Sequence, residues 1–209
     1  MKQLDILGKL FGSLNRVKIM RFFLLNHETA FSIDDIIGRL RLRPRDGKEE
    51  LVILARAGFI KPKIVTKAVV KRGKSSRKKF KGFVANPEFA LSDPLRSLLV
   101  DASSMHLPEL PARFAKAGKV NLFIVSGIFI QDTDRTMDLM IVGDRLDKKL
   151  IERKIKEIES EIGKELRYAI FETPEFMYRL KMYDKLLRDV LDYPHEKLVS
   201  KIDHPELRR

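Results

Sequence analysis

The chain has 209 residues, and its 42 Lys and Arg against 29 Asp and Glu give a formal net charge of +13. Cysteine is absent, which excludes disulfide bonds and cysteine zinc sites and fits a reducing cytoplasm. No run of about eighteen apolar residues occurs, so the sequence predicts no membrane span.

The positive charge is concentrated in one half of the chain. Residues 1–106 contain 22 Lys and Arg against 10 Asp and Glu, whereas residues 107–209 contain 20 against 19. The total length suits two domains of about 100 residues each. The uneven charge therefore favours a module that binds a polyanion, joined to a neutral module.

Three short helices are predicted at the start of the chain. Apolar residues recur at helical spacing through residues 14–26. Ser32 is a good N-cap for a second helix in the segment FSIDDIIGRL. A third helix begins near Arg45 and stops at Gly58.

A strongly basic β-hairpin is predicted after these helices. β-Branched and aromatic residues dominate Ile64–Val70 and Phe80–Ala85, which are predicted as its strands. The segment KRGKSSRKK between them is predicted as the hairpin tip, because it contains Gly and Ser. No acidic residue occurs between positions 61 and 82, and the ten basic ones are Lys61, Lys63, Lys67, Lys71, Arg72, Lys74, Arg77, Lys78, Lys79 and Lys81.

The order of three helices and a basic hairpin, with ELVILARAGFI at residues 50–60, resembles the winged helix-turn-helix domain of small bacterial and archaeal regulators. The similarity extends over roughly residues 10–90 and implies a DNA-binding domain over residues 1–90. In such a domain the third helix enters the major groove, while the hairpin lies along the DNA backbone or in the minor groove. The expected DNA contacts are Arg43, Arg45, Lys48, Lys71, Arg72, Lys74, Arg77, Lys78 and Lys79.

A plain solvated surface is the alternative interpretation of the basic run, because most charge runs on proteins are solvated. Ten like charges within this short segment repel one another, however, and a folded hairpin that holds them together favours an anionic partner. Duplex DNA is favoured over RNA, because no aromatic side chains interleave the basic residues to stack on unpaired bases.

Residues 91–106 are expected to form a helical connector. Ser92 can cap a helix that has Pro94 in its first turn. A further helix is predicted over residues 109–117, and the domain boundary is expected near residues 102–108.

The second half of the chain, residues 107–209, has the pattern of a small α/β layer structure. Strands are predicted in KVNLFIVSG (119–127), TMDLMIVGD (136–144) and LRYAIFE (166–172), and EKLVS (196–200) ends the fold. Helices are predicted in the amphipathic segment KKLIERKIKEIESEIG (148–163) and in TPEFMYRLKMYDKLLRDVL (173–191).

These elements resemble the minimal nucleotidyltransferase family of the polymerase-β superfamily over roughly residues 107–200. The matching pieces are a strand, a Gly/Ser turn, the acidic strand that ends in LMIVGD, a helix, a strand and the tail TPEFMYRL…LRDVLDYPHEKLV. In active members a Gly-Ser turn holds the triphosphate, and two Asp residues on the next strand, with a third Asp on a later strand, hold two magnesium ions. Alternate strand residues point to one side, so the paired carboxylates reach the same ions.

The metal-binding residues of that family are largely missing from this chain. The turn is Ser126-Gly127, in reversed order, and the paired-Asp position is TMD at 136–138, which leaves only Asp138. The third carboxylate falls near Arg167, and Arg cannot bind Mg²⁺. We therefore expect a catalytically degenerate domain with no metal and no cofactor, in which Asp138 is a remnant.

Two alternatives for this region stay open. Asp132 and Asp134, in the loop before the acidic strand, would have to converge with Asp138 to restore a metal site. A retained phosphate site would consist of Ser126, Gly127 and Arg167.

The expected fold class is α+β, with an N-terminal winged helix domain and a C-terminal nucleotidyltransferase-like α/β domain. The expected function is a cytoplasmic DNA-binding transcription regulator, whose C-terminal domain is a pseudoenzyme used for dimerisation, partner binding or ligand sensing. Its expected partners are double-stranded DNA, a second copy of the chain and a further protein. The alternatives are an active Mg-dependent nucleotidyltransferase acting on RNA or protein, and an antitoxin-like partner of a toxin.

Overall fold

The computed structural model describes residues 3–71, 74–101, 107–132 and 135–207. The fold is mixed α+β with two separate sheets. It divides into two compact units, of which the first contains Met1–Ser103 with Glu157–Lys164 and the second contains Ser104–Lys156 with Glu165–Arg209. In the described part of the chain, none of the helices has the length and apolar character needed to span a membrane.

The first unit begins with helices. They are α1 (Gln3–Leu10), α2 (Leu14–Leu25), α3 (Ile33–Arg39) and α4 (Pro44–Arg56). The three predicted helices are confirmed as α2, α3 and α4, whereas no sequence pattern indicated α1. Ser32 begins α3 in a capping box: its hydroxyl accepts a hydrogen bond from the Asp35 N–H at 3.3 Å, and the Asp35 carboxylate accepts one from the Ser32 N–H.

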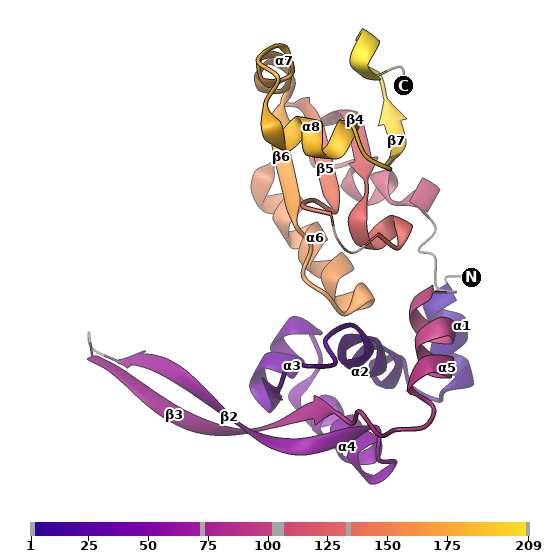
Figure 1. Ribbon diagram of the computed structural model, residues 1–209, viewed down its shortest axis with the longest axis vertical. Helices are drawn as coiled ribbons and strands as arrows, with labels where there is room; N and C mark the ends of the chain where they lie inside the picture. Colours follow the sequence, from indigo (N-terminus) through magenta and orange to yellow (C-terminus); the bar gives the residue numbers. More distant parts are fainter. Residues whose placement is uncertain (1–2, 72–73, 102–106, 133–134, 208–209) are drawn as a thin grey trace. The chain divides into compact units, whose positions relative to one another are not determined.

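A three-stranded antiparallel sheet completes the first unit. Its strands, in the spatial order β1-β3-β2, are β1 (Phe31–Ser32), β2 (Ile60–Lys71) and β3 (Lys74–Ala85). β2 and β3 form one long hairpin that extends away from the helices of this unit (Figure 1). The predicted tip, KRGKSSRKK, is wrong in extent, because residues 74–79 belong to β3 and pair with residues 66–71. Cross-strand pairing, which local composition does not report, overrides the weak strand propensity of Lys and Ser here.

A lysine beyond the middle of β2 attaches the hairpin to the start of α3. The Lys67 ammonium donates to the Ser32 hydroxyl at 2.7 Å and forms an ion pair with Asp35. β1 reaches β3 only because position 82 is glycine: a Cβ on Gly82 would overlap the carbonyl oxygen of Phe31. The hairpin is therefore held to the start of α3 as far as the pair formed by Lys67 and Lys78, and its last four residue pairs extend beyond this support.

The first unit has one apolar core, and the connector is attached to it. The core includes Val17, Ile19, Phe22, Phe23, Ile36, Leu40, Leu51, Leu54, Phe59 and Ile60. The connector begins as α5 (Ser92–Arg96) and continues as a π-helical turn, Ser97–Asp101, while residues 102–106 lie outside the described part. Arg21, which is buried, donates from Nε to the carbonyl oxygen of Leu99 at 2.8 Å and so fixes this turn against α2.

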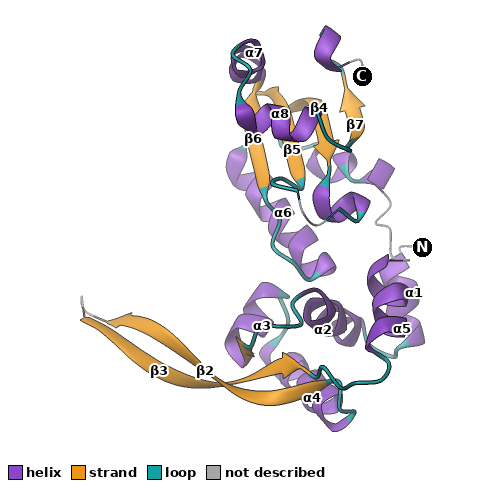
Figure 2. Ribbon diagram, in the orientation of Figure 1, coloured by secondary structure: helices purple, strands orange, loops and turns teal. Residues whose placement is uncertain are grey.

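The second unit is built on a four-stranded sheet in the order β6-β5-β4-β7 (Figure 2). Its strands are β4 (Lys119–Val125), β5 (Leu139–Asp144), β6 (Tyr168–Glu172) and β7 (Glu196–Ser200). Its helices are α7 (Thr173–Lys181), α8 (Lys185–Leu191) and the part of α6 (Lys148–Ile162) that precedes Glu157. β5 and β6 are parallel, so the chain between them must cross over the sheet, and α6 forms that crossover. The predicted strands and helices of this region are confirmed, except that residues 126–127 and 136–138, predicted as strand, lie outside β4 and β5, so Asp138 comes just before its strand.

α7 and α8 pack on one face of this sheet. Phe176 and Leu187 belong to the same buried cluster as Met140 and Val142 of β5. The alternate strand residues point to the other face, where the Phe123 ring lies 5.4 Å from that of Phe114.

The helix predicted over residues 109–117 is wrong. Two short 3-10 turns, Leu107–Glu109 and Pro111–Phe114, occupy this region instead. Proline has no backbone N–H to donate within a helix, which accounts for the break at Pro111. Backbone hydrogen bonds of the 3-10 type, such as that from the Arg113 N–H to the Leu110 carbonyl oxygen at 3.1 Å, and the burial of Leu110 and Phe114 hold the segment in place.

The contact between Lys67 and Asp35 leads to a pH-dependent prediction. Burial raises the pKa of Asp35, but hydrogen bonds from Lys67 and Ser32 outweigh it, so the pKa lies below its ordinary value of 3.8. A depressed carboxyl pKa stabilises the folded state above the unfolded pKa, and this stabilisation is lost as the pH falls through the folded pKa. Asp35→Asn should therefore lower the free energy of unfolding by about 0.5–1 kcal/mol at pH 7, since the pair is partly solvated.

Urea unfolding followed by circular dichroism at several pH values checks this prediction. The difference between wild type and Asp35→Asn should shrink as the pH falls below about 4. A difference that stays constant down to about pH 2.5 would show that the charge of Asp35 does not support the hairpin.

Candidate functional site

The β2–β3 ladder sorts the basic side chains of the hairpin onto two faces. Lys78 lies opposite Lys67 in the register. Because alternate residues of a strand point to opposite faces, Arg77, Lys79 and Lys81 share one face, and Lys67 and Lys78 share the other. All three side chains of the first face are exposed, and they repeat about every 6.7 Å along β3. This row of cations can follow a phosphate backbone.

Five of the six hairpin residues predicted to bind DNA lie in its distal half. Arg77, Lys78 and Lys79 are exposed side chains of β3, Lys71 and Lys74 form the last pair of the ladder, and Arg72 lies outside the described residues. In the part of the chain that the structure describes, Arg77, Lys78 and Lys79 form no ion pair. Their charge is therefore available to an anionic partner.

Among the residues described, carboxylates pair with two lysines of the hairpin, one near its base and one beyond the middle of β2. Lys61 forms an ion pair with Glu88 at 2.6 Å, and Lys67 forms one with Asp35. Composition alone counts these two lysines as part of the basic run. The structure assigns both to holding the hairpin in place, whereas Lys81, which was not among the predicted contacts, joins the exposed row.

The start of α4 carries the other predicted DNA contacts. Arg43 is the N-cap residue, and its exposed side chain makes no capping hydrogen bond. Lys48 is exposed one turn further on, whereas Arg45 forms an ion pair with Glu49 at 3.0 Å. Asp46 and Glu49 reduce the local net charge. The hairpin therefore supplies most of the positive potential, and the α4 N-terminus adds exposed donors and the positive end of a helix dipole.

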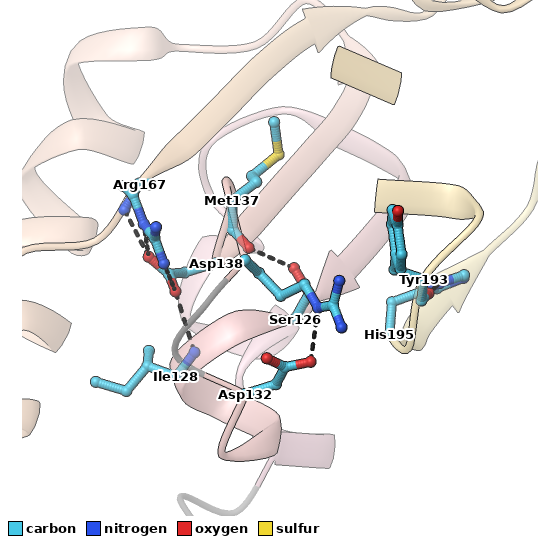
Figure 3. Close-up of polar contacts among 9 residues, drawn as sticks. Ser126, Ile128, Asp132, Met137, Asp138, Arg167, Tyr193 and His195 are labelled. Carbon is cyan, nitrogen blue, oxygen red and sulfur yellow. Dashed lines mark hydrogen bonds and ion pairs between the residues drawn. The ribbon is translucent and has the colours of Figure 1, made fainter. Parts of the chain in front are cut away.

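In the second unit, the Ser126-Gly127 turn is built around the carboxylate of Asp138 (Figure 3). Gly127 has a φ of 56°, and a Cβ there would overlap Asp138 Oδ1, so glycine is required. The Ile128 N–H donates to that Oδ1 at 3.0 Å. The Ser126 hydroxyl donates to the Met137 carbonyl at 2.6 Å, so it points into the protein and stabilises the turn.

Arg167 closes the other side of Asp138. Its backbone N–H donates to Asp138 Oδ2 at 2.9 Å, its Nε donates to Oδ2 at 3.2 Å, and its Nη2 donates to Oδ1 at 3.3 Å. The Asp138 side chain is only 4% exposed. An ionised carboxylate offers about four acceptor positions, and these three donors together with the Ile128 N–H occupy them.

This arrangement does not fit the two-magnesium site of an active nucleotidyltransferase. Asp138 is enclosed by donors, and the Arg167 guanidinium beside it repels a cation. Asp132 does not join Asp138, because it forms an ion pair with Arg135 at 2.6 Å, and Asp134 lies outside the described residues. Among the residues described, no cluster of three or more His, Asp or Glu side chains could hold a metal ion.

A contact between Arg135 and Tyr193 was not indicated by any sequence pattern. The Arg135 guanidinium lies over the Tyr193 ring, 4.4 Å from its centroid, and His195 Nδ1 lies 2.8 Å from the Tyr193 carbonyl oxygen. The pairing of β7 with β4 brings them here, because Glu196 lies opposite Val125 in the register. A contact between segments this far apart depends on strand order, which local patterns do not contain.

Comparison with known proteins gives no family for the chain: no protein-family model, curated protein or solved structure matches it. The functional assignment depends on the charge distribution and on the geometry of the two sites. The basic hairpin with the start of α4 is one site, and the Ser126-Gly127 turn with Asp138 and Arg167 is the other.

The enclosure of Asp138 predicts a structural role for this residue. Asp138→Ala removes the acceptor of four hydrogen bonds and leaves Arg167 without its carboxylate, so it should lower the free energy of unfolding by about 3 kcal/mol. Asp132→Ala is the matched control. It breaks a partly exposed ion pair and should cost less than about 1 kcal/mol.

Urea unfolding of the two variants and of wild type checks this prediction. Equal and small effects of the two substitutions would mean that the carboxylate of Asp138 does not support the turn.

Proposed function

We propose that the chain is a DNA-binding transcription regulator that holds duplex DNA through its first unit. The order α2-β1-α3-α4-β2-β3, with strand order β1-β3-β2 and a long terminal hairpin, agrees with a winged helix-turn-helix domain. In this proposal the start of α4 enters the major groove, and the hairpin contacts the phosphate backbone.

The observation that carries this proposal is the charge of the distal hairpin. Arg77, Lys78 and Lys79 are exposed cations in adjacent positions, and among the described residues they form no ion pair. Holding like charges together in folded structure is unfavourable in the absence of an anion. A polyanion removes that repulsion and releases its own condensed counterions, which makes binding favourable and sensitive to salt.

We infer that the second unit is not an active nucleotidyltransferase. Metal-dependent transfer needs several carboxylates with free lone pairs, which neutralise phosphate charge and position the nucleophile. Here the one carboxylate at the matching position, Asp138, accepts hydrogen bonds from Ile128 and Arg167. The proposed role of this unit is to stabilise the assembly and bind partners.

The DNA-binding proposal predicts a steep dependence of affinity on salt. Binding of the full chain to a labelled duplex of about 25 base pairs can be measured by fluorescence anisotropy between about 50 and 300 mM salt. The combined variant Arg77→Ala, Lys78→Ala, Lys79→Ala should reduce the slope of log K against log salt by about 2–3, since each phosphate contact contributes about 0.9. Affinity at 100 mM salt should fall about a hundredfold.

The matched control removes the same charge from another surface. Lys148, Lys149 and Arg153 are exposed on α6, and within the described residues they form no ion pair. Replacing all three by Ala should leave the slope within about 0.5 of wild type. Equal losses in both triple variants would attribute binding to net charge alone, and no wild-type binding would reject the proposal.

The inference about the second unit predicts no nucleotide transfer. Incubation of the full chain with labelled nucleoside triphosphates and Mg²⁺ or Mn²⁺, with RNA or protein acceptors, should give no labelled product. Incorporation that Asp138→Asn or Asp132→Asn abolishes would establish these carboxylates as metal ligands and overturn the inference.

A further inference from the structure

The two faces of the β2–β3 hairpin differ in how far they are already occupied. Lys67, Lys78 and Phe80 lie on one face, because Lys67 is paired with Lys78 in the register and Phe80 follows two residues later. The Lys67 ammonium lies 5.5 Å from the centroid of the Phe80 ring and forms an ion pair with Asp35 of α3. Both Lys67 and Phe80 are half-buried. This face is therefore turned toward the start of α3 and is partly used for contacts within the first unit.

The opposite face of the hairpin is exposed. Cross-strand partners lie on the same side of a ladder, and the pairs on this face are Ile64 with Lys81, Thr66 with Lys79, and Ala68 with Arg77. All of these side chains are exposed, and Ile64 is 58% exposed although it is apolar. We call these six residues the outer face of the hairpin.

The outer face is divided lengthwise into two rows. β3 contributes the cations Arg77, Lys79 and Lys81, and β2 contributes the uncharged residues opposite them. The rows are about 4.8 Å apart, which is the spacing of neighbouring strands. The other face lacks this division, because Lys67 of β2 lies opposite Lys78 of β3. The outer face therefore has a line of positive charge along one strand and a neutral surface along the other.

This pattern matches the chemistry at the edge of a DNA groove. Each DNA strand presents a line of phosphate charges, whereas the sugars and bases beside it in the groove carry no charge. One row of cations can neutralise the phosphates, and the neutral row can approach the groove without burying an unpaired charge. An acidic protein surface, whose charges are spread over an area, would be matched by cations on both strands. The outer face therefore favours duplex DNA over a broader anionic surface.

We propose that the outer face is the surface of the hairpin that lies on duplex DNA, with β3 along one phosphate backbone and β2 over the adjacent groove. This inference rests on the proposed function and extends it by assigning the face and the strand that make the contact. It also separates two neighbours: Lys79 contacts a phosphate, whereas Lys78 points to the other side of the hairpin. The combined variant of Arg77, Lys78 and Lys79 should then lose about two phosphate contacts.

The two neighbouring lysines provide a matched test. Lys79→Ala and Lys78→Ala remove the same charge from adjacent positions of β3, and both side chains are exposed. Binding of the full chain to a mixed-sequence duplex of about 25 base pairs can be followed by fluorescence anisotropy between about 50 and 300 mM salt. Lys79→Ala should reduce the slope of log K against log salt by about 0.9 and the affinity at 100 mM salt about eightfold. Lys78→Ala should change the slope by less than about 0.3 and the affinity less than about twofold.

The neutral row is tested by labelling. The chain contains no cysteine, so a single introduced cysteine can be modified selectively. Ala68→Cys places it on the outer face, and Ser76→Cys places it on the other face, where Ser76 is exposed opposite Val69. A bulky uncharged maleimide leaves the net charge unchanged. At position 68 it should weaken binding at least about tenfold, because it holds the cation row away from the backbone, and at position 76 less than about twofold. Both unlabelled variants should bind as wild type does.

The outcomes separate this inference from the function on which it rests. Wild-type chain that binds no duplex would overturn the proposed function and this inference together. Binding that Lys78→Ala weakens as much as Lys79→Ala, or that both labels weaken equally, would reject the outer face and leave the proposed function in place. Circular dichroism and urea unfolding show whether each variant is folded. Because the labels are added to the folded chain, the labelling result decides the question if an alanine variant is not folded.

Discussion

Repulsion among the cations of the β2–β3 hairpin is the constraint on which the account of this protein depends. The hairpin holds ten Lys and Arg and no acidic residue between positions 61 and 82. The hairpin is supported from outside: Glu88 pairs with Lys61, Asp35 pairs with Lys67, and β1 pairs with β3. Among the described residues Arg77, Lys78 and Lys79 form no ion pair, and in our proposal a polyanion stabilises them.

The second unit has a hydrogen-bonded centre at Asp138. The Ser126-Gly127 turn, the start of β5 and the start of β6 meet at Asp138. In our interpretation, a guanidinium stands where an active nucleotidyltransferase holds metal ions, and Arg167 neutralises the carboxylate while contributing hydrogen bonds. Such a centre stabilises the unit.

Sequence patterns predicted the elements whose signals are local. Ser32 marked the start of α3, and apolar periodicity marked α2 and α6. The patterns failed where distant segments decide the outcome: residues 74–79 are strand because β2 lies beside them, and residues 109–117 do not form the expected helix. In the same way, sequence placed Arg167 near Asp138 through a resemblance, but the direction of the Ser126 hydroxyl and the stacking of Arg135 on Tyr193 follow from tertiary contacts.

The most direct test of the central claim maps the surface that meets DNA. Amide chemical shifts of the ¹⁵N-labelled chain can be followed during titration with a short duplex at low salt. The account predicts that the changes concentrate in the distal part of β2 and β3 and at the start of α4, while β4–β7 and α7 stay unchanged. Changes confined to the second unit, or none at all, would contradict it.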